Sequence, residues 1–247
     1  MDRAAMRDEM VASLEHEAKG YLESAAISVA MRTVPRELFV PSDRDEQAYT
    51  DQSFEQAGSR ILSPSRVGQL LEALSPTPGE SVLIVGSGVG YTVAIVAEIV
   101  GAENVQAIDI DRQLVTIARR NLDRAGYGDV LVDRADGTDG YAPYAPYDRI
   151  LVEAAAVRPP ATLLAQLNDD GILVLPTGTQ SQILARYDRD GERVGEFGRV
   201  SFNPLLLEGE QHGTIERNRT HREDQEFAAR ELTRQSGWEH NWIDWTQ

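Results

Sequence analysis

The sequence lacks cysteine altogether, which excludes disulfide bonds, thiolate metal sites and cysteine nucleophiles. It also lacks any apolar run that approaches the ~20 residues of a membrane-spanning helix. Its first 20 residues are charged throughout and contain no apolar core of a secretory signal. These absences favour a cytoplasmic protein that has no membrane partner.

Lysine is nearly absent as well. Lys19 is the only lysine among 24 basic residues, which face 40 acidic residues and leave a net charge of −16. An acidic surface of this kind is typical of a salt-rich cytoplasm, where molar salt shortens the Debye length to ~3 Å and makes the repulsion tolerable. A GC-rich genome would favour arginine codons but would not explain the acidity. With no basic cluster longer than Arg119-Arg120, the composition argues against a nucleic-acid partner.

From residue 81 onward, short apolar runs rich in β-branched residues alternate with amphipathic segments. This alternation predicts an α/β fold with a Rossmann-like, doubly wound, mostly parallel sheet. Two further strands, at residues 181–187 and 198–207, are expected to close one edge in antiparallel fashion. The parallel strands are expected at residues 81–85, 105–109, 130–132, 147–152 and 171–176, with helices at residues 90–100, 112–125 and 159–167.

The regions on either side of this pattern have a different character. Residues 2–33 are predicted to be helical, and Val34-Pro35 ends that pattern because the residue before proline avoids the α region. Residues 41–62 are polar and irregular. A helix is then expected to begin at Ser63, a favourable N-cap, with Pro64 at its first position. The main domain would cover residues 1–207, and residues 208–247 would form a polar helical extension.

The extension contains all three tryptophans of the chain, Trp238, Trp242 and Trp245. Their spacing of four and three residues places them on one face of a helix. They either pack on the extension's own domain or bind a partner. Packing is favoured, because three exposed tryptophans would be an aggregation hazard.

A glycine-rich turn follows the first predicted strand, with the sequence Gly86-Ser87-Gly88-Val89-Gly90. Glycines at a strand-to-helix turn let a ligand approach the backbone, and the helix start presents free N–H groups. Tyr91 stands where a dinucleotide motif would have its third glycine. Asp109 ends the next strand, where an acidic residue binds ribose hydroxyls, although it could instead cap the following helix, as Asp111 could. The pattern favours S-adenosylmethionine (AdoMet) over NAD.

Several motifs occur in the order found in one known family. Residues 34–41 are VPRELFVP, residues 82–91 are VLIVGSGVGY, residues 136–140 are DGTDG and residues 145–148 are APYD. In these segments, and across roughly residues 10–206, the chain resembles the protein-L-isoaspartate (D-aspartate) O-methyltransferases. The resemblance implies a class I methyltransferase fold and AdoMet as cofactor. It also implies methyl transfer to the free carboxylate of isoaspartyl residues in damaged proteins, which begins their repair.

The resemblance also implies positions for the cofactor. The glycine turn would hold its methionine part, Asp109 its ribose, and Asp136 with Gly137 its adenine side. The loop at residues 58–64 would lie over the transferred methyl group, which brings Ser59, Ile61 and Leu62 to the cofactor. An in-line displacement from a sulfonium to an ionised carboxylate depends on positioning and exclusion of water more than on a general base. The four histidines are scattered, so no metal site is expected.

Three positions depart from the family pattern. Leu62 stands where the family has its active-site serine; the adjacent Ser63 is the catalytic candidate, although its first interpretation is a helix cap. Ile84 replaces a carboxylate that helps orient the methionine end of the cofactor. Glu153 replaces a threonine, and could either compensate for Ile84 or repel an anionic substrate.

These departures leave three hypotheses open. The chain methylates isoaspartyl proteins, or it is an AdoMet-dependent methyltransferase with another acceptor, or it binds AdoMet without catalysis and acts as an adaptor. Methyl incorporation into an isoaspartyl peptide, compared with its aspartyl counterpart, separates the first hypothesis from the other two.

Overall fold

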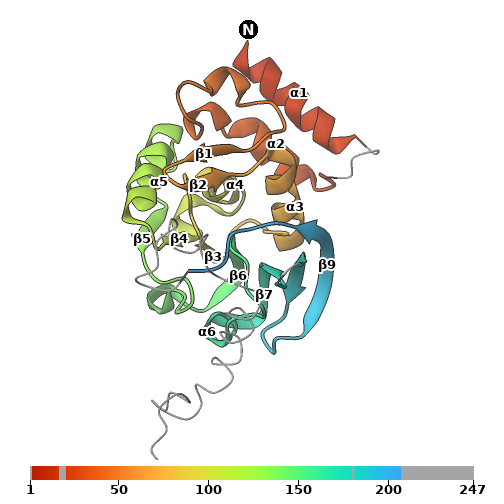
Figure 1. Cartoon of the computed structure of the whole chain (residues 1–247), viewed down its shortest axis with the longest axis vertical. Helices are drawn as coiled ribbons and strands as arrows, with labels where there is room; N and C mark the ends of the chain where they lie inside the picture. Colours follow the sequence, from red (N-terminus) through yellow and green to blue (C-terminus); the bar gives the residue numbers. More distant parts are fainter. Residues whose placement is uncertain (1, 17–20, 180, 207–247) are drawn as a thin grey trace, which may run out of the picture.

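A computed structural model describes residues 2–16, 21–179 and 181–206 of the chain. Seven strands form one twisted sheet in the order β5-β4-β3-β6-β7-β8-β9 (Figure 1). The first five of these strands run parallel, whereas β8 and β9 are antiparallel to their neighbours. The strands are β3 Val82–Val85, β4 Val105–Asp109, β5 Leu131–Arg134, β6 Tyr147–Val152, β7 Leu167–Thr177, β8 Gln182–Tyr187 and β9 Arg193–Val200. The predicted α/β class and antiparallel edge are confirmed.

The order of the strands changes direction at β3, because successive strands are added first on one side of β3 and then on the other. From β3 it proceeds outward through β4 and β5, then returns to pair β6 with the other side of β3. A sheet of this kind has a crevice at the carboxyl ends of the strands, where the connections diverge. The fold therefore places a ligand site above the ends of β3, β4 and β6.

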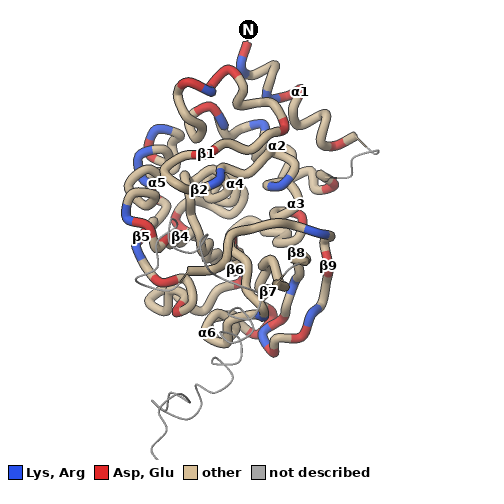
Figure 2. The backbone as a smooth tube through the Cα atoms, viewed as in Figure 1, with Lys and Arg blue, Asp and Glu red and all other residues tan. Residues whose placement is uncertain are grey.

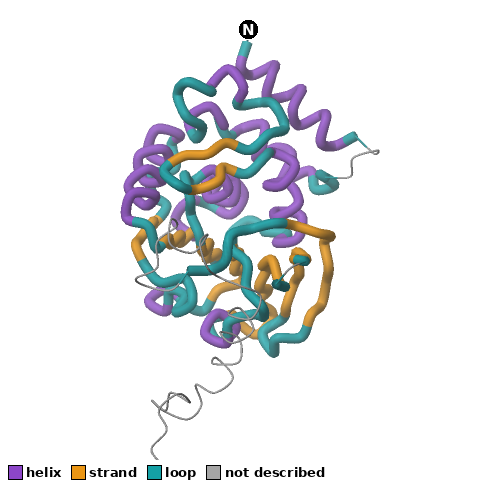
Figure 3. The backbone as a smooth tube through the Cα atoms, viewed as in Figure 1, coloured by secondary structure: helices purple, strands orange, loops and turns teal. Residues whose placement is uncertain are grey.

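Helices cover the sheet mainly on one face (Figure 3). Buried side chains of helices α2 to α5 pack there against Val82 and Ile84, while the shorter helix α6 packs on the opposite face with Leu83 and Val85. This division follows from the alternation of side chains along a strand. The α-helices are α1 Arg3–Glu15, α2 Ala25–Thr33, α3 Pro64–Leu74, α4 Tyr91–Val100, α5 Arg112–Ala125 and α6 Ala161–Leu164.

The expectation of continuous helix over residues 2–33 is wrong. Two helices, α1 and α2, occupy this region, and residues 21–24 are not helical. The Glu72 side chain on α3 accepts hydrogen bonds from the backbone N–H groups of Glu23 and Ser24, both at 2.8 Å. These bonds hold the chain in a non-helical conformation immediately before α2 begins.

Residues 41–62 are not wholly irregular either, because they contain a hairpin. Strands β1 (Phe54–Gln56) and β2 (Ser59–Ile61) pair in antiparallel fashion. The two residues that join them, Ala57 and Gly58, have positive φ angles of 52° and 76°. Two consecutive residues of this conformation form the tight turn that matches the twist of a hairpin.

Two predicted boundaries near the carboxyl half also need correction. The helix expected over residues 159–167 is the four-residue α6, because Leu167 already pairs with Tyr147 as the first residue of β7. The strand expected over residues 198–207 is β9, Arg193–Val200, and the chain then continues without regular structure to residue 206. The predicted extension at residues 208–247, with its three tryptophans, lies outside the described residues.

Charged side chains lie largely on the outer helices, on loops and along the edge strand β9 (Figure 2). The central strand β3 carries none, and all four of its residues are buried. Among the helices in the described ranges, none has the length and apolar character that a membrane crossing requires.

Candidate active site

A cavity opens at the carboxyl edge of the sheet, where the strand order predicts a crevice. It encloses about 820 Å³ of space, open solvent at its mouth included. Its walls come from the ends of β3, β4 and β6, the loop after β5, the hairpin and the segment after β9. The lining residues are Ser59, Arg60, Leu62, Val85, Gly86, Gly88, Ile108, Asp109, Ile110, Leu114, Ala135, Gly137, Glu153, Ala154 and residues 201–206.

The glycine turn forms the floor of the cavity beside β3. Gly86, Gly88 and Gly90 have φ angles of 89°, 52° and 94°, a region that favours glycine. The N–H groups of Gly86 and Ser87 donate to the Ile108 carbonyl at 2.8 and 3.0 Å, which ties the turn to β4. Gly86 and Gly88 line the cavity, whereas Ser87 and Val89 are buried and Gly90 packs against α5.

Asp109, at the end of β4, is held against this turn. Its carboxylate accepts from the Gly88 N–H at 2.9 Å and from the Asp111 N–H at 3.0 Å. The alternative role of Asp109 as a helix cap is wrong, because Asp111 caps α5 by accepting from the Gln113 N–H at 2.7 Å. Asp109 is thus a buried carboxylate, 7% exposed, that lines the cavity.

Glu153 contributes a second carboxyl group to the same cavity. It directly follows β6, and its N–H donates to the Val85 carbonyl at 2.8 Å. The Thr92 hydroxyl, in the first turn of α4, acts to lower the pKa of its carboxyl group, but burial outweighs this effect. Burial, reinforced by the negative charge of Asp109, raises the pKa of Glu153 to about 7. A perturbed carboxyl group in a cleft is characteristic of functional sites.

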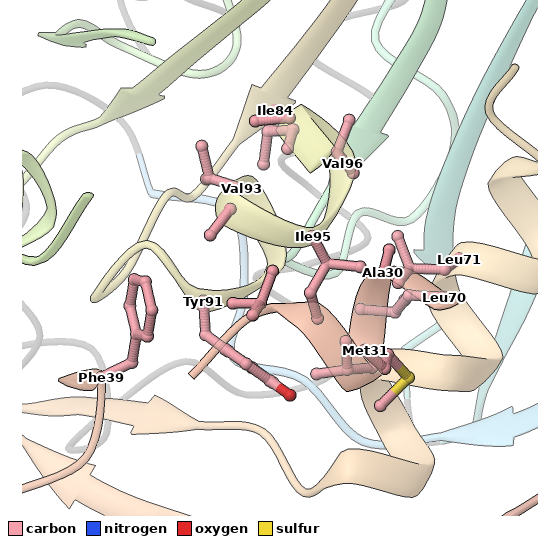
Figure 4. Close-up of a cluster of buried hydrophobic side chains, with 14 of the residues drawn as sticks. Ala30, Met31, Phe39, Leu70, Leu71, Ile84, Tyr91, Val93, Ile95 and Val96 are labelled. Carbon is pink, nitrogen blue, oxygen red and sulfur yellow. The ribbon is translucent and has the colours of Figure 1, made fainter. Parts of the chain in front are cut away.

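Ile84, the other departure near the turn, lies on the opposite side of β3. Its side chain is fully buried, and Figure 4 shows it beside Val93 and Val96 of helix α4. Ile84 therefore belongs to the core and does not line the cavity. Among the described residues that line the cavity, Asp109 and Glu153 carry the carboxylates.

The hairpin covers one side of the cavity mouth. Ser59, Arg60 and Leu62 line the cavity, whereas Ile61 is 3% exposed and packs into the core. Ser63 is the N-cap of α3, as predicted, and its hydroxyl accepts from the Arg66 N–H at 3.4 Å. Ser63 is not among the lining residues, and its catalytic role stays a prediction.

The loop after β5 forms another wall. Gly137 lines the cavity, and a Cβ at this position would collide with the Val85 side chain, so only glycine fits there. The Asp136 carboxylate accepts from the N–H and the hydroxyl of Thr138, at 2.8 and 2.7 Å. Asp136 therefore shapes the loop that presents Gly137, and it is not itself a lining residue.

Residues 201–206 close the last side of the cavity, and sequence reasoning missed them. The N–H of Ala155 donates to the Asn203 carbonyl at 2.8 Å, and the N–H of Leu205 donates to the Ala155 carbonyl at 2.9 Å. The side-chain amide of Gln182 donates to the Phe202 carbonyl at 3.0 Å and accepts from the Phe202 N–H at 2.7 Å. Arg60 was also missed. Residues 201–206 carry no local signal, because long-range pairing with Ala155 brings them to the site, whereas Arg60 lies in the loop that was expected there and was not singled out.

Within the described ranges, no group of three or more His, Asp or Glu side chains is arranged to hold a metal ion. The charged side chains that line the cavity are Arg60, Asp109 and Glu153. The site thus offers one buried carboxylate (Asp109), one half-buried carboxyl group (Glu153), one guanidinium at the mouth and glycine backbone for close approach of a ligand.

Comparison with known proteins identifies relatives over most of the chain. The sequence model of the family described as protein-L-isoaspartate(D-aspartate) O-methyltransferase matches residues 5–206. A protein of that name from Ignicoccus hospitalis is 40% identical over 197 residues, which cover 77% of this chain and 93% of the relative. Its counterpart from Methanopyrus kandleri is 42% identical over 197 residues, covering 76% of this chain and 87% of that one.

Solved structures agree with this relationship. A structure named protein-L-isoaspartate O-methyltransferase aligns with a TM-score of 0.69 and 26% identity, over 80% of this chain and 65% of that chain. Another from Plasmodium falciparum, in complex with S-adenosyl-L-homocysteine, aligns with a TM-score of 0.69 over 81% of this chain and 98% of that one. At 20% identity, the second likeness concerns the fold alone.

Proposed function

The chain belongs to the protein-L-isoaspartate(D-aspartate) O-methyltransferase family. We propose which of its residues bind AdoMet and the isoaspartyl carboxylate during methyl transfer. The enzyme is an AdoMet-dependent carboxyl methyltransferase. The observation that carries the assignment of residues is the cavity at the carboxyl edge of β3, β4 and β6, which brings the glycine turn, Asp109 and Gly137 together.

The residues present fit the cofactor. The glycine turn has positive φ angles and no side chains at Gly86 and Gly88, so a ligand can approach its backbone. At Gly137 a Cβ would collide with Val85, so this wall also presents bare backbone. We assign the methionine part to Gly86 and Gly88, the ribose hydroxyls to Asp109, and the adenine side to Gly137. In nucleotide-binding folds of this topology, an acidic residue at the corresponding position accepts a hydrogen bond from a ribose hydroxyl.

AdoMet supplies a methyl group already activated by a sulfonium. The acceptor, a carboxyl group with an ordinary pKa near 4, is ionised at neutral pH. The chain therefore needs no general base, and its contribution is to orient the acceptor and exclude water. Leu62, Phe202 and Leu205 give the cavity apolar walls suited to that task.

Recognition of the acceptor falls to the mouth of the cavity. Among the described lining residues, Arg60 is the only one with a positive charge, and its side chain is 47% exposed. Its ion pair with Glu55 is long, at 3.8 Å, and both side chains are solvated, so the pair is weak. Arg60 is therefore available to attract an anionic acceptor into a cavity whose interior carries two carboxylates.

A paired methylation assay tests this function. The enzyme is incubated with labelled AdoMet and two peptides of one sequence, which differ only in an isoaspartyl or an aspartyl residue. Labelling of the isoaspartyl peptide alone is expected. Equal labelling of both peptides, or of neither while a protein extract is labelled, would indicate another acceptor. Binding of AdoMet without any turnover would favour the adaptor hypothesis.

The composition supports one further proposal about where the enzyme works. The chain has 40 acidic and 24 basic residues, and all but one of the basic residues are arginine. This acidic composition suits a salt-rich cytoplasm. The proposed partners there are proteins that carry isoaspartyl damage, and the methyl ester is the first step of their repair. A binding role for Trp238, Trp242 and Trp245 concerns residues outside the described ranges.

A further inference from the structure

Glu153 is a half-buried acidic group that the proposed reaction does not use. It stands one residue beyond the end of β6, next to the glycine turn: a Cβ added to Gly86 would lie 3.5 Å from its Cβ. Glu153 lines the cavity, and the Thr92 hydroxyl of helix α4 interacts with its carboxyl group. The side chain is thus fixed at the point where the ligand meets the start of helix α4.

The surroundings of Glu153 leave its negative charge without a cationic partner. In the part of the chain that the structure describes, no basic side chain forms an ion pair with it, and the charged group that acts on it most is the Asp109 carboxylate. The third charged residue of the cavity, Arg60, is at the exposed mouth and pairs with Glu55. The Asp109 charge favours the protonated form of Glu153, and a cation bound beside both groups would favour its ionised form.

The ligand assigned to this cavity is itself cationic. Its methionine part carries an ammonium group, and its sulfur carries a second positive charge. The methionine part is the portion assigned to the glycine turn, against which Glu153 lies. No carboxylate reaches the cavity from β3, since Val85 is the last side chain of that strand and Ile84 faces the core.

We propose that Glu153 is the cofactor-binding carboxylate for the methionine end of AdoMet, accepting hydrogen bonds from its ammonium group at the glycine turn. This inference rests on the proposed function, because it takes AdoMet as the ligand of the cavity. It settles the two roles that the sequence left open for Glu153 in favour of cofactor binding over repulsion of the acceptor.

Three ligands separate this role from others in a calorimetric titration of the full chain. AdoMet carries both the ammonium and the sulfonium, S-adenosyl-L-homocysteine carries the ammonium alone, and 5′-methylthioadenosine carries neither. Substitution Glu153→Gln keeps the size of the side chain and its contact with Thr92. We expect it to weaken S-adenosyl-L-homocysteine about tenfold or more, the usual effect of losing a hydrogen bond to a charged group. Binding of 5′-methylthioadenosine should change less than about twofold on the same reasoning.

A control variant and a proton measurement complete the test. Glu103→Gln removes an equal charge from an exposed site at the other end of β4 and should leave all three affinities unchanged. Because the pKa of Glu153 is raised to about 7, an ammonium bound beside it should ionise the group and release a proton near that pH. Titrations of S-adenosyl-L-homocysteine in two buffers of different ionisation enthalpy would detect that proton in the wild type and not in Glu153→Gln.

The outcomes distinguish the two proposals. If the wild type binds none of the ligands, the proposed function fails and this inference fails with it. If the wild type binds but Glu153→Gln loses the same factor for 5′-methylthioadenosine as for S-adenosyl-L-homocysteine, Glu153 only supports the shape of the cavity. If Glu153→Gln binds all three ligands normally, Glu153 has no part in binding the cofactor, while the proposed function stands.

Discussion

Glu153 should make the ligand-free protein less stable as pH rises. The pKa of this group is about 7 in the folded protein, compared with an ordinary value of 4.5. Between these two values the folded state holds a proton that the unfolded state has lost. Stability contributed by this group is therefore fully present below pH 4.5 and disappears as pH rises through 7. The sign is opposite to that of a salt-bridged carboxylate, whose folded pKa is depressed.

The size of the effect follows from the shift. One pKa unit corresponds to about 1.4 kcal/mol, so the difference between 4.5 and about 7 gives an upper limit of about 3 kcal/mol above pH 8. Glutamine at this position cannot ionise and keeps the contact with Thr92. Glu153→Gln should thus match the wild type near pH 4.5 and exceed its free energy of unfolding by up to about 3 kcal/mol near pH 8.5.

Urea unfolding at several pH values and one fixed, high salt concentration measures this difference. Fixed salt is needed because the net charge of −16 makes every variant sensitive to ionic strength. The control Glu103→Gln removes one charge from an exposed position and should differ from the wild type by a constant amount. The reasoning is refuted if the gain from Glu153→Gln is equally constant between pH 4.5 and 8.5, or if it is largest at low pH.

Four further predictions concern the rest of the site and the surface. Asp109→Ala should weaken binding of S-adenosyl-L-homocysteine by about 1.5–3 kcal/mol, measured by calorimetry, because a charged acceptor for the ribose is lost; unchanged affinity in a folded variant would contradict the assignment. Arg60→Gln should raise KM for an isoaspartyl peptide and leave cofactor affinity unchanged, whereas the exposed control Arg124→Gln should change neither. Ser63→Ala should cost roughly 0.5–2 kcal/mol in thermal or urea unfolding with kcat little changed if Ser63 only caps α3, while a tenfold loss of kcat/KM would show that it positions the substrate. The melting temperature should rise from low to molar potassium chloride, and a flat or falling series would remove the interpretation of the charge as an adaptation to salt.

The alternating strands and helices were predictable because their signals are local. Strands β4 and β6 have the predicted boundaries because they are short apolar runs, and α5 does because it combines an apolar stripe at helical spacing with the N-cap Asp111. The N-cap at Ser63 was also predictable from the proline that follows it. The order of β3, β4 and β6, and hence the position of the crevice, then follows from general rules for parallel sheets.

The elements that were missed depend on distant partners. The break before α2 is stabilised by Glu72, 48 residues from Ser24; Gly20 and the N-cap Ser24 were local signals for it that the prediction did not use. The hairpin at residues 54–61 has strands of three residues each, too short for an alternating pattern to be distinguished from irregular chain. For the same reason, the cavity wall at residues 201–206 could not be predicted, because its contacts with Ala155 cross the sheet.

The candidate site was partly predictable, and the failures have a common cause. Gly86, Gly88 and Asp109 could be assigned because a strand end followed by glycine fixes where backbone and carboxylate point. For Ile61 and Leu62 the sequence indicated proximity to the cofactor, but only the register of β2 decides which faces the cavity. The alternation of side chains along β3 likewise sends Ile84 to the core, a direction that depends on which face α4 covers.

The positions of the charged side chains in the cavity offer one explanation for the departures from the family pattern at Leu62, Ile84 and Glu153. Asp109 is buried and Glu153 half-buried beside the glycine turn, and Arg60 is at the solvent-exposed mouth. Methyl transfer here joins a cationic donor to an anionic acceptor, so a cavity that is negative inside and positive at its entrance attracts each to its own end. With Glu153 supplying the inner charge and Arg60 the outer one, neither a carboxylate at Ile84 nor a hydroxyl at Leu62 is needed to keep that order. The three departures then leave this order of charges in place, with the carboxylate for the cofactor directly after β6 and the group for the acceptor on β2.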